Sequence, residues 1–208
     1  MQIKPVVSDR KTQIMEATIT SLAEHGYEGT TFARIVASAG LSSTRLITYH
    51  FETKQDLLVA TLQHIGRTAQ AVMVPQLEAQ RTARGKLSAY LRSNLGFLAE
   101  NPAYARAAVQ IARHLPVEDP EADLGSDLPV VLLAQLFTTG QATGELRAFD
   151  PVVMAVTVRA AVDSAVDRVA QGGRTDLTAY AEELCALFDR AIRADRPAVA
   201  DDDVEDVR

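Results

Sequence analysis

Apolar residues recur every three or four positions along almost the whole chain, and no long stretch alternates apolar with polar residues. This spacing is typical of amphipathic α-helices, so the pattern predicts an all-α protein of about nine helices. The expected helices cover residues 9–26, 31–39, 43–50, 54–74, 82–100, 102–114, 129–143, 151–170 and 175–194.

Residues that begin or end helices stand at the ends of these segments. The sequence T-K-Q-D at 53–56 has the form of a capping box, in which the first and last side chains each bond the other's backbone N–H. Asp150 and Pro151 form an N-cap followed by proline at the first helical position. We expect Thr175 to cap the last helix and Pro75 to end the fourth.

The composition is that of a globular protein. The 208 residues are 47% hydrophobic and 23% charged, enough for one large domain or two small ones sharing a core. There is no apolar run long enough for a membrane span and no N-terminal secretory signal, so we expect a cytoplasmic protein. The single cysteine, Cys185, excludes a disulfide framework. The histidines (His25, His50, His64, His114) lack metal-ligand spacing, so we expect no metal and no other cofactor.

Charge is distributed unevenly along the chain. The net charge of −6 argues at first against a nucleic-acid partner. Residues 1–54, however, carry six basic and five acidic side chains, while acids gather in 118–127 and in the tail 195–208. We expect the tail to be disordered. The first quarter of the chain thus remains compatible with DNA.

The segment 30–54 has the layout of a helix-turn-helix, in which a short amphipathic helix ends at Gly40 and a second short helix follows. In this second helix Ile47 and Phe51 stand four positions apart and are expected to anchor it to a core. The opposite face then carries Thr44, Arg45, Thr48 and Tyr49. Such side chains bond phosphates and base edges, which favours DNA in the major groove.

The stretch 10–62 contains E-H-G-Y-E-G-T-T-F-A-R-I-V-A-S-A-G-L-S-S-T and then Y-H-F-E-T-K-Q-D-L-L. In these residues it resembles the N-terminal DNA-binding domain of the TetR (tetracycline repressor) family of bacterial regulators. The segment 136–151, L-F-T-T-G-Q-A-T-G-E-L-R-A-F-D-P, is similar to the end of that family's regulatory domain. The resemblance implies a helix-turn-helix domain at 8–54, a linking helix at 54–74 and a ligand-binding and dimerisation bundle at 75–194.

The resemblance also implies which residues meet double-stranded DNA. Arg45 would bond guanine, Thr48 would pack on a thymine methyl, and Lys54 would bind a phosphate. The stretch 40–51 is one residue longer than the family's commonest spacing, so base contacts at 43–45 can shift by one position. The expected DNA-binding set is Thr31, Ser42, Ser43, Thr44, Arg45, Thr48, Tyr49, His50 and Lys54.

In the family resembled, a small molecule binds among the helices of the C-terminal domain. The low aromatic content and the absence of Trp argue against a large cage for planar cations, and a moderately sized apolar or weakly polar effector is expected. The candidate ligand-binding residues are Tyr90, Asn94, Phe97, Tyr104, Gln110, His114, Gln135, Phe137 and Arg159. Arg159 and Asp163 are alternatively placed across a dimer interface.

Helix 151–170 is apolar over most of its circumference, because its polar residues Arg159, Asp163 and Asp167 share one narrow stripe. Helix 175–194 also has apolar residues beside its main stripe. The two helices predict a four-helix homodimer interface; the alternative is a central helix in a monomeric bundle.

The sequence therefore predicts a sequence-specific transcriptional regulator, a homodimeric repressor released from a palindromic operator by an effector. An activator, a co-repressor-dependent regulator and a helical protein-binding adaptor are the alternatives. An enzyme is not expected, because the chain has no phosphate-binding glycine loop, no G-x-S-x-G and no H-E-x-x-H.

Overall fold

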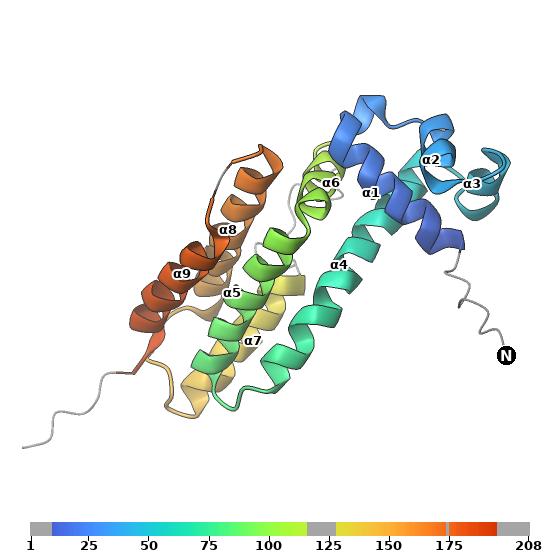
Figure 1. Cartoon of the computed structure of the whole chain (residues 1–208). Helices are drawn as coiled ribbons and strands as arrows, with labels where there is room; N and C mark the ends of the chain where they lie inside the picture. The colour runs from blue at the N-terminus through green and yellow to red at the C-terminus, as the bar shows by residue number, and fades with distance from the viewer. Residues whose placement is uncertain (1–9, 116–127, 174, 195–208) are drawn as a thin grey trace, which may run out of the picture.

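The computed structural model describes residues 10–115, 128–173 and 175–194. Within these ranges the chain forms nine α-helices, and its only β pairing there is an isolated bridge between Leu146 and Arg193, which confirms the all-α prediction (Figure 1). The helices are α1 (Arg10–Gly29), α2 (Phe32–Ala39), α3 (Arg45–His50), α4 (Lys54–Glu78), α5 (Ala83–Glu100), α6 (Pro102–Ala112), α7 (Leu128–Ala142), α8 (Pro151–Ala170) and α9 (Leu177–Ile192).

Helices α1, α2 and α3 gather at one end of the molecule around the start of α4 (Figure 1). The side chain of Thr31 caps α2 by accepting from the Arg34 backbone N–H, and Gly40 ends α2 in the left-handed region at φ 62°. The first helix is expected to end at residue 26; Gly26 there has φ 67° and kinks the chain, and α1 continues beyond it to Gly29. A small apolar core holds the three helices to α4 and consists of Ile14, Met15, Ala17, Ile35, Ala39, Ile47, Phe51 and Leu57.

Helix α4 runs from this end of the molecule along the remaining helices (Figure 1). The expected capping box is confirmed, because Thr53 and Asp56 bond each other's backbone N–H groups. The prediction that α4 ends before Pro75 is wrong, since the helix continues to Glu78. Proline removes one helical hydrogen bond, but Met73 and Leu77 on either side pack into the main core and hold the last turn in place.

The remaining helices form a bundle around α5. Glu145, in the loop after α7, accepts the backbone N–H groups of Ala83 and Arg84 at 2.8 and 2.9 Å and so caps α5 from a distance of some 60 residues in sequence. Arg84 in turn makes a two-point ion pair with Asp189 of α9, which lowers the pKa of that carboxyl group. One end of the bundle is thus closed by polar contacts between α5, the loop after α7 and α9.

Two smaller expectations about helix starts are corrected. Asp176, rather than Thr175, caps α9, because its carboxylate accepts two backbone N–H groups and it directly precedes the first helical residue. Helix α3 begins at Arg45, two residues later than expected, although the Ser43 carbonyl already accepts from the Leu46 backbone N–H. Residues 8–9, which the sequence offers as the N-cap of the first helix, lie outside the described residues, as do the acidic segment 118–127 and the tail 195–208. No helix in the described ranges is long and apolar enough to cross a membrane.

The close packing of α7 depends on Gly140. A Cβ atom on Gly140 would lie 2.6 Å from Leu146 Cδ1 and 2.8 Å from Ala83 Cβ. We therefore expect Gly140→Ala to lower the free energy of unfolding by about 1–3 kcal/mol, measured by urea denaturation. Gly96→Ala is the matched control, because a Cβ there meets nothing within 4 Å and should stabilise α5 by about 0.5–1 kcal/mol. Equal effects of the two changes would contradict the packing argument.

Candidate functional site

Helix α3 presents a polar face outward and an apolar face to the core. Ile47 and Phe51 are buried, as predicted, while Arg45, Thr48 and Tyr49 are exposed. Tyr49 is 81% exposed, which is rare for a tyrosine and leaves its hydroxyl accessible to a partner. Ser42, Ser43 and Thr44, in the turn and at the cap before α3, are exposed too. The structure therefore brings the sequence-predicted contact residues of this region onto one accessible surface.

Lys54, at the first position of α4, is half-buried against the end of α1. Its Nζ donates to the Tyr27 carbonyl oxygen at 3.2 Å and lies 3.9 Å from the centroid of the Tyr27 ring. The Tyr27 ring is also stacked on the ring of His114, which follows α6. The two ring centroids are 3.9 Å apart and the angle between the ring planes is 5°. The lysine at the edge of the helix-turn-helix is thus joined through Tyr27 to the segment that follows α6.

A cavity of about 810 Å³ lies between α4, α5, α6, α7 and α8. Five of the nine candidate ligand-binding residues line it, namely Tyr90, Asn94, Phe97, Tyr104 and Arg159. The other four do not: Gln110 and His114 contact Tyr27 and its surroundings, Gln135 faces a separate groove, and Phe137 is fully buried in the core. The volume is within the range of about 300–1,000 Å³ that is usual for small-molecule sites.

The polar stripe of α8 faces this cavity, since Arg159, Asp163 and Asp167 all line it. Arg159 and Asp163 form an ion pair at 2.8 Å. Four more polar side chains line the cavity, Gln70, Glu78, Lys86 and Asn94, and the rest of the lining is apolar or aromatic. The sequence left open whether Arg159 and Asp163 face a ligand pocket or a dimer interface. Within this chain both residues line the cavity.

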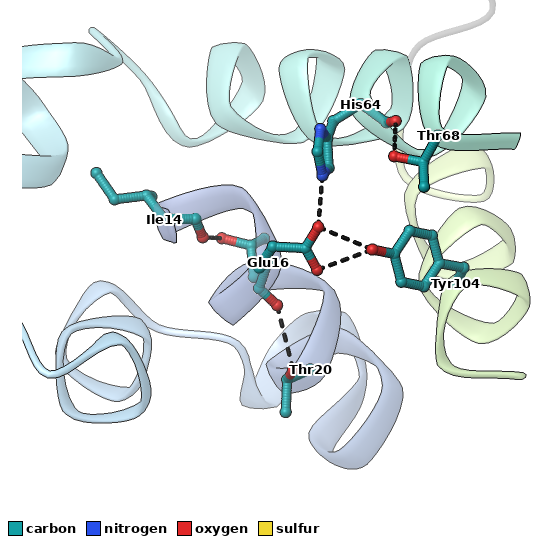
Figure 2. A network of polar contacts seen from close by, with 7 residues as sticks. Ile14, Glu16, Thr20, His64, Thr68 and Tyr104 are labelled. Carbon is teal, nitrogen blue, oxygen red and sulfur yellow. Dashed lines mark hydrogen bonds and ion pairs between the residues drawn. The ribbon is translucent and has the colours of Figure 1, made fainter. Parts of the chain in front are cut away.

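A polar cluster connects the cavity wall to α1, as Figure 2 shows. The hydroxyl of Tyr104, a cavity-lining residue on α6, lies 2.8 and 2.9 Å from the two carboxylate oxygens of Glu16 on α1. His64 Nε2 on α4 lies 2.5 Å from Glu16 Oε1. Burial and the hydrogen bond to Glu16 raise the pKa of the Tyr104 hydroxyl, so it remains a proton donor.

Sequence reasoning missed Glu16 and His64 as functional residues. Their partners stand 48 and 88 positions away along the chain, and neither residue lies in a recognisable motif. A lone polar residue inside an amphipathic pattern, such as Glu16 among Ile14, Met15 and Ala17, is the only local signal.

The N-terminal part of the chain is similar in sequence to known regulatory proteins. The model of the family described as bacterial regulatory proteins, tetR family, matches residues 14–61, which comprise most of α1, all of α2 and α3 and the start of α4. Over this segment the chain is thus similar to the TetR family. The regulator BetI of Burkholderia ambifaria is 33% identical over 86 residues, 41% of this chain. The matched segment spans 44% of BetI, so the similarity covers less than half of this relative.

Solved structures of transcriptional regulators extend the likeness of fold over most of the chain. A TetR-family transcriptional regulator from Rhodococcus sp. has a TM-score of 0.74 and 26% identity, covering 88% of this chain and 98% of its own. A transcriptional regulator from Saccharomonospora viridis in complex with choline gives 0.73 at 22% identity, covering 90% and 100% of the two chains. FadR from Bacillus subtilis in complex with stearoyl-CoA gives 0.67 at 19% identity, covering 84% and 95%. The relatives are named as regulators rather than enzymes, in agreement with the sequence prediction.

The hydroxyl of Tyr104 offers a direct test of the cluster. Removing it by Tyr104→Phe should lower the free energy of unfolding by about 1 kcal/mol, because the half-exposed Glu16 carboxylate loses its donor. In a double-mutant cycle with Glu16→Gln the two costs should be less than additive. Tyr180→Phe is the control, since that hydroxyl makes only a 3.4 Å contact. Additive costs in urea denaturation would mean that the two side chains act independently.

Proposed function

We propose that this protein is a sequence-specific DNA-binding transcriptional regulator whose affinity for DNA depends on a small molecule in the cavity. The exposed polar face of α3 is the single observation that carries the DNA-binding part. Its residues stand on a rigid helix anchored by Ile47 and Phe51, which is what base readout in the major groove requires. In the form we favour, the protein is a repressor released from its operator by the effector.

Each predicted DNA contact has a place in this proposal. Thr31, at the start of α2, and Lys54, at the start of α4, would bind phosphates on either side of the groove. The Lys54 ammonium has three N–H donors and uses one on Tyr27, so a phosphate can be bound as well. Tyr49 and His50 would contact the backbone. The residues at 42–45 and Thr48 would lie nearest the bases.

The proposed domains share α4. Residues 10–53 would read DNA, and the bundle after α4 would bind the effector and a second subunit. Helix α4 belongs to both parts, because it packs its first turns on α1 and lines the cavity from Leu62 to Glu78. Two proteins of this fold solved with choline and with stearoyl-CoA support a small molecule as the effector.

A route from cavity to DNA is provided by the Tyr104–Glu16–His64 cluster. An effector that displaces Tyr104 would weaken the hold of α6 on α1, and so alter the orientation of α2 and α3. The effector must bind the DNA-incompetent arrangement more tightly. A hundredfold loss of operator affinity requires about 2.7 kcal/mol of such preference.

Two DNA-reading ends would come from a homodimer. Apolar side chains are exposed on the side of α8 away from the cavity stripe and on α9, with Val153 62% and Leu187 56% exposed. Exposed valine and leucine on adjacent helices favour a partner surface. A dimer through α8 and α9 would place the two α3 helices about two-fold symmetrically and predicts a palindromic operator.

Selection from random DNA duplexes tests the DNA-binding proposal. We expect a palindromic sequence to be enriched, with log affinity falling steeply against log salt. Arg45→Ala should cost about 1–3 kcal/mol and relax preference at one base position in each half-site. Lys54→Ala should weaken binding to all sequences and reduce the salt slope. Arg67→Ala, an exposed arginine on α4, is the control.

No enrichment at low salt, with the protein folded, would overturn the DNA-binding proposal and favour a protein-binding adaptor. Enrichment with an effector that raises affinity would instead identify a co-repressor-dependent regulator. An increase in transcription on binding would identify an activator.

The dimer proposal is tested by charge placed on its surface. Leu187→Glu combined with Val153→Glu should shift the protein from dimer to monomer in analytical ultracentrifugation, because two carboxylates would be buried without partners. Leu128→Glu, which changes an equally exposed leucine on α7, should leave the dimer intact. A dimer that persists in the double variant would place the interface elsewhere.

A further inference from the structure

The part of the cavity wall formed by α8 carries more negative than positive charge. On α8 two carboxylates, Asp163 and Asp167, accompany one guanidinium, Arg159, which is already paired with Asp163 at 2.8 Å. No ion pair among the described residues includes Asp167. Asp167 also lies in the last turn of α8, where the helix dipole adds negative potential. This wall therefore favours a positive charge.

The rest of the cavity suits a hydrocarbon body. Helices α4 and α7 contribute aliphatic side chains, including Met73, Leu133 and Leu136, and the interior reaches about 810 Å³. The lining also includes the rings of Phe97 and Tyr104, which lie edge to face with their centroids 5.7 Å apart. Aromatic faces attract a cation that has lost part of its water. A carboxylate in the same position would meet two acids.

We propose that the cavity binds a monocationic amphiphile, an alkylammonium whose charged group lies against Asp163 and Asp167 and whose chain extends between α4 and α7. This inference deepens the proposed function and rests on it, because it names the chemical class of the effector. Glu78 and Lys86, the other charged residues of the lining, offset each other, so the α8 stripe decides the sign.

The first experiment compares two probes of equal chain length, decyltrimethylammonium and decanoate, by isothermal titration calorimetry on the full chain below their micelle-forming concentrations. We expect the cation to bind at least tenfold more tightly. Shortening the chain to octyltrimethylammonium should weaken binding by about fourfold for each methylene that the cavity no longer buries. Equal binding, tighter binding of decanoate or binding of neither probe would overturn the proposal.

Charge variants test the position of the ammonium group. Asp163→Asn with Asp167→Asn leaves Arg159 as the only charged residue of the stripe, so the preference should change from the cation to decanoate. Glu100→Gln, an exposed acid at the end of α5 outside the cavity lining, is the matched control and should leave the preference unchanged. An unchanged preference in the double variant would overturn the assignment to α8.

A variant with a side chain filling the cavity tests where the alkyl chain of the probe binds. Gly66 lines the cavity, and a Cβ atom there meets nothing within 4 Å, so Gly66→Leu should occupy the space without a clash and reduce binding at least tenfold. Gly96→Leu makes the same change in open space outside the lining. Undiminished binding by a folded Gly66→Leu protein would mean that the probe sits on the surface, and the charge variants decide the question if that protein does not fold. The calorimetry contains no DNA, so a protein that selects an operator but binds no cation disproves only this inference.

Discussion

The Glu16 carboxylate is the contact on which the arrangement of the two halves depends. It projects from α1 and receives Tyr104 from α6 and His64 from α4, so one side chain joins three helices. The apolar contacts beside it, Leu22 and Ile111 among them, hold the helices together without fixing their rotation. A carboxylate with two directional partners fixes that rotation, because its hydrogen bonds weaken steeply with misalignment. The link between α1 and α6 therefore includes a side chain that lines the cavity, Tyr104.

The cavity follows from the division of α8 into a polar stripe and an apolar face. A helix with Arg159, Asp163 and Asp167 on one stripe cannot bury that stripe in a dry core without a large desolvation cost. The bundle instead leaves open space in front of the stripe and packs Ala155, Val158 and Val162 against α5 and α7. The same constraint that prevents close packing there produces a site with an apolar interior and a charged wall. An effector that is only weakly polar, as expected from the aromatic content, would not compensate the excess negative charge of that stripe.

Local signals in the sequence predicted most of the fold and the outer face of α3. Spacing and capping placed α2 and the start of α4 because the residues concerned, such as Thr53 and Asp56, act within one turn. The error at the end of α4 has a physical cause in tertiary contacts: α4 passes Pro75 because Met73 and Leu77 are held by the core. Five of the nine candidate ligand-binding residues line the cavity, since helix faces show which residues point inward but not which of them border an open space. The Glu16 cluster joins residues up to 88 positions apart, and no periodicity can show it.

The energies involved are compatible with control of DNA binding through so few contacts. A hydrogen bond to a charged group contributes about 1.5–3 kcal/mol, which is the same order as the differential binding needed for a hundredfold change in operator affinity. Displacing Tyr104 from the half-exposed Glu16 would thus supply part of this difference, and other contacts of the effector would supply the remainder. Coupling of this kind is reciprocal, so in the proposed mechanism operator DNA would weaken effector binding by the same factor. The half-buried position of Lys54, held between Tyr27 and a DNA phosphate in the proposed complex, provides a second contact through which DNA would act on α6.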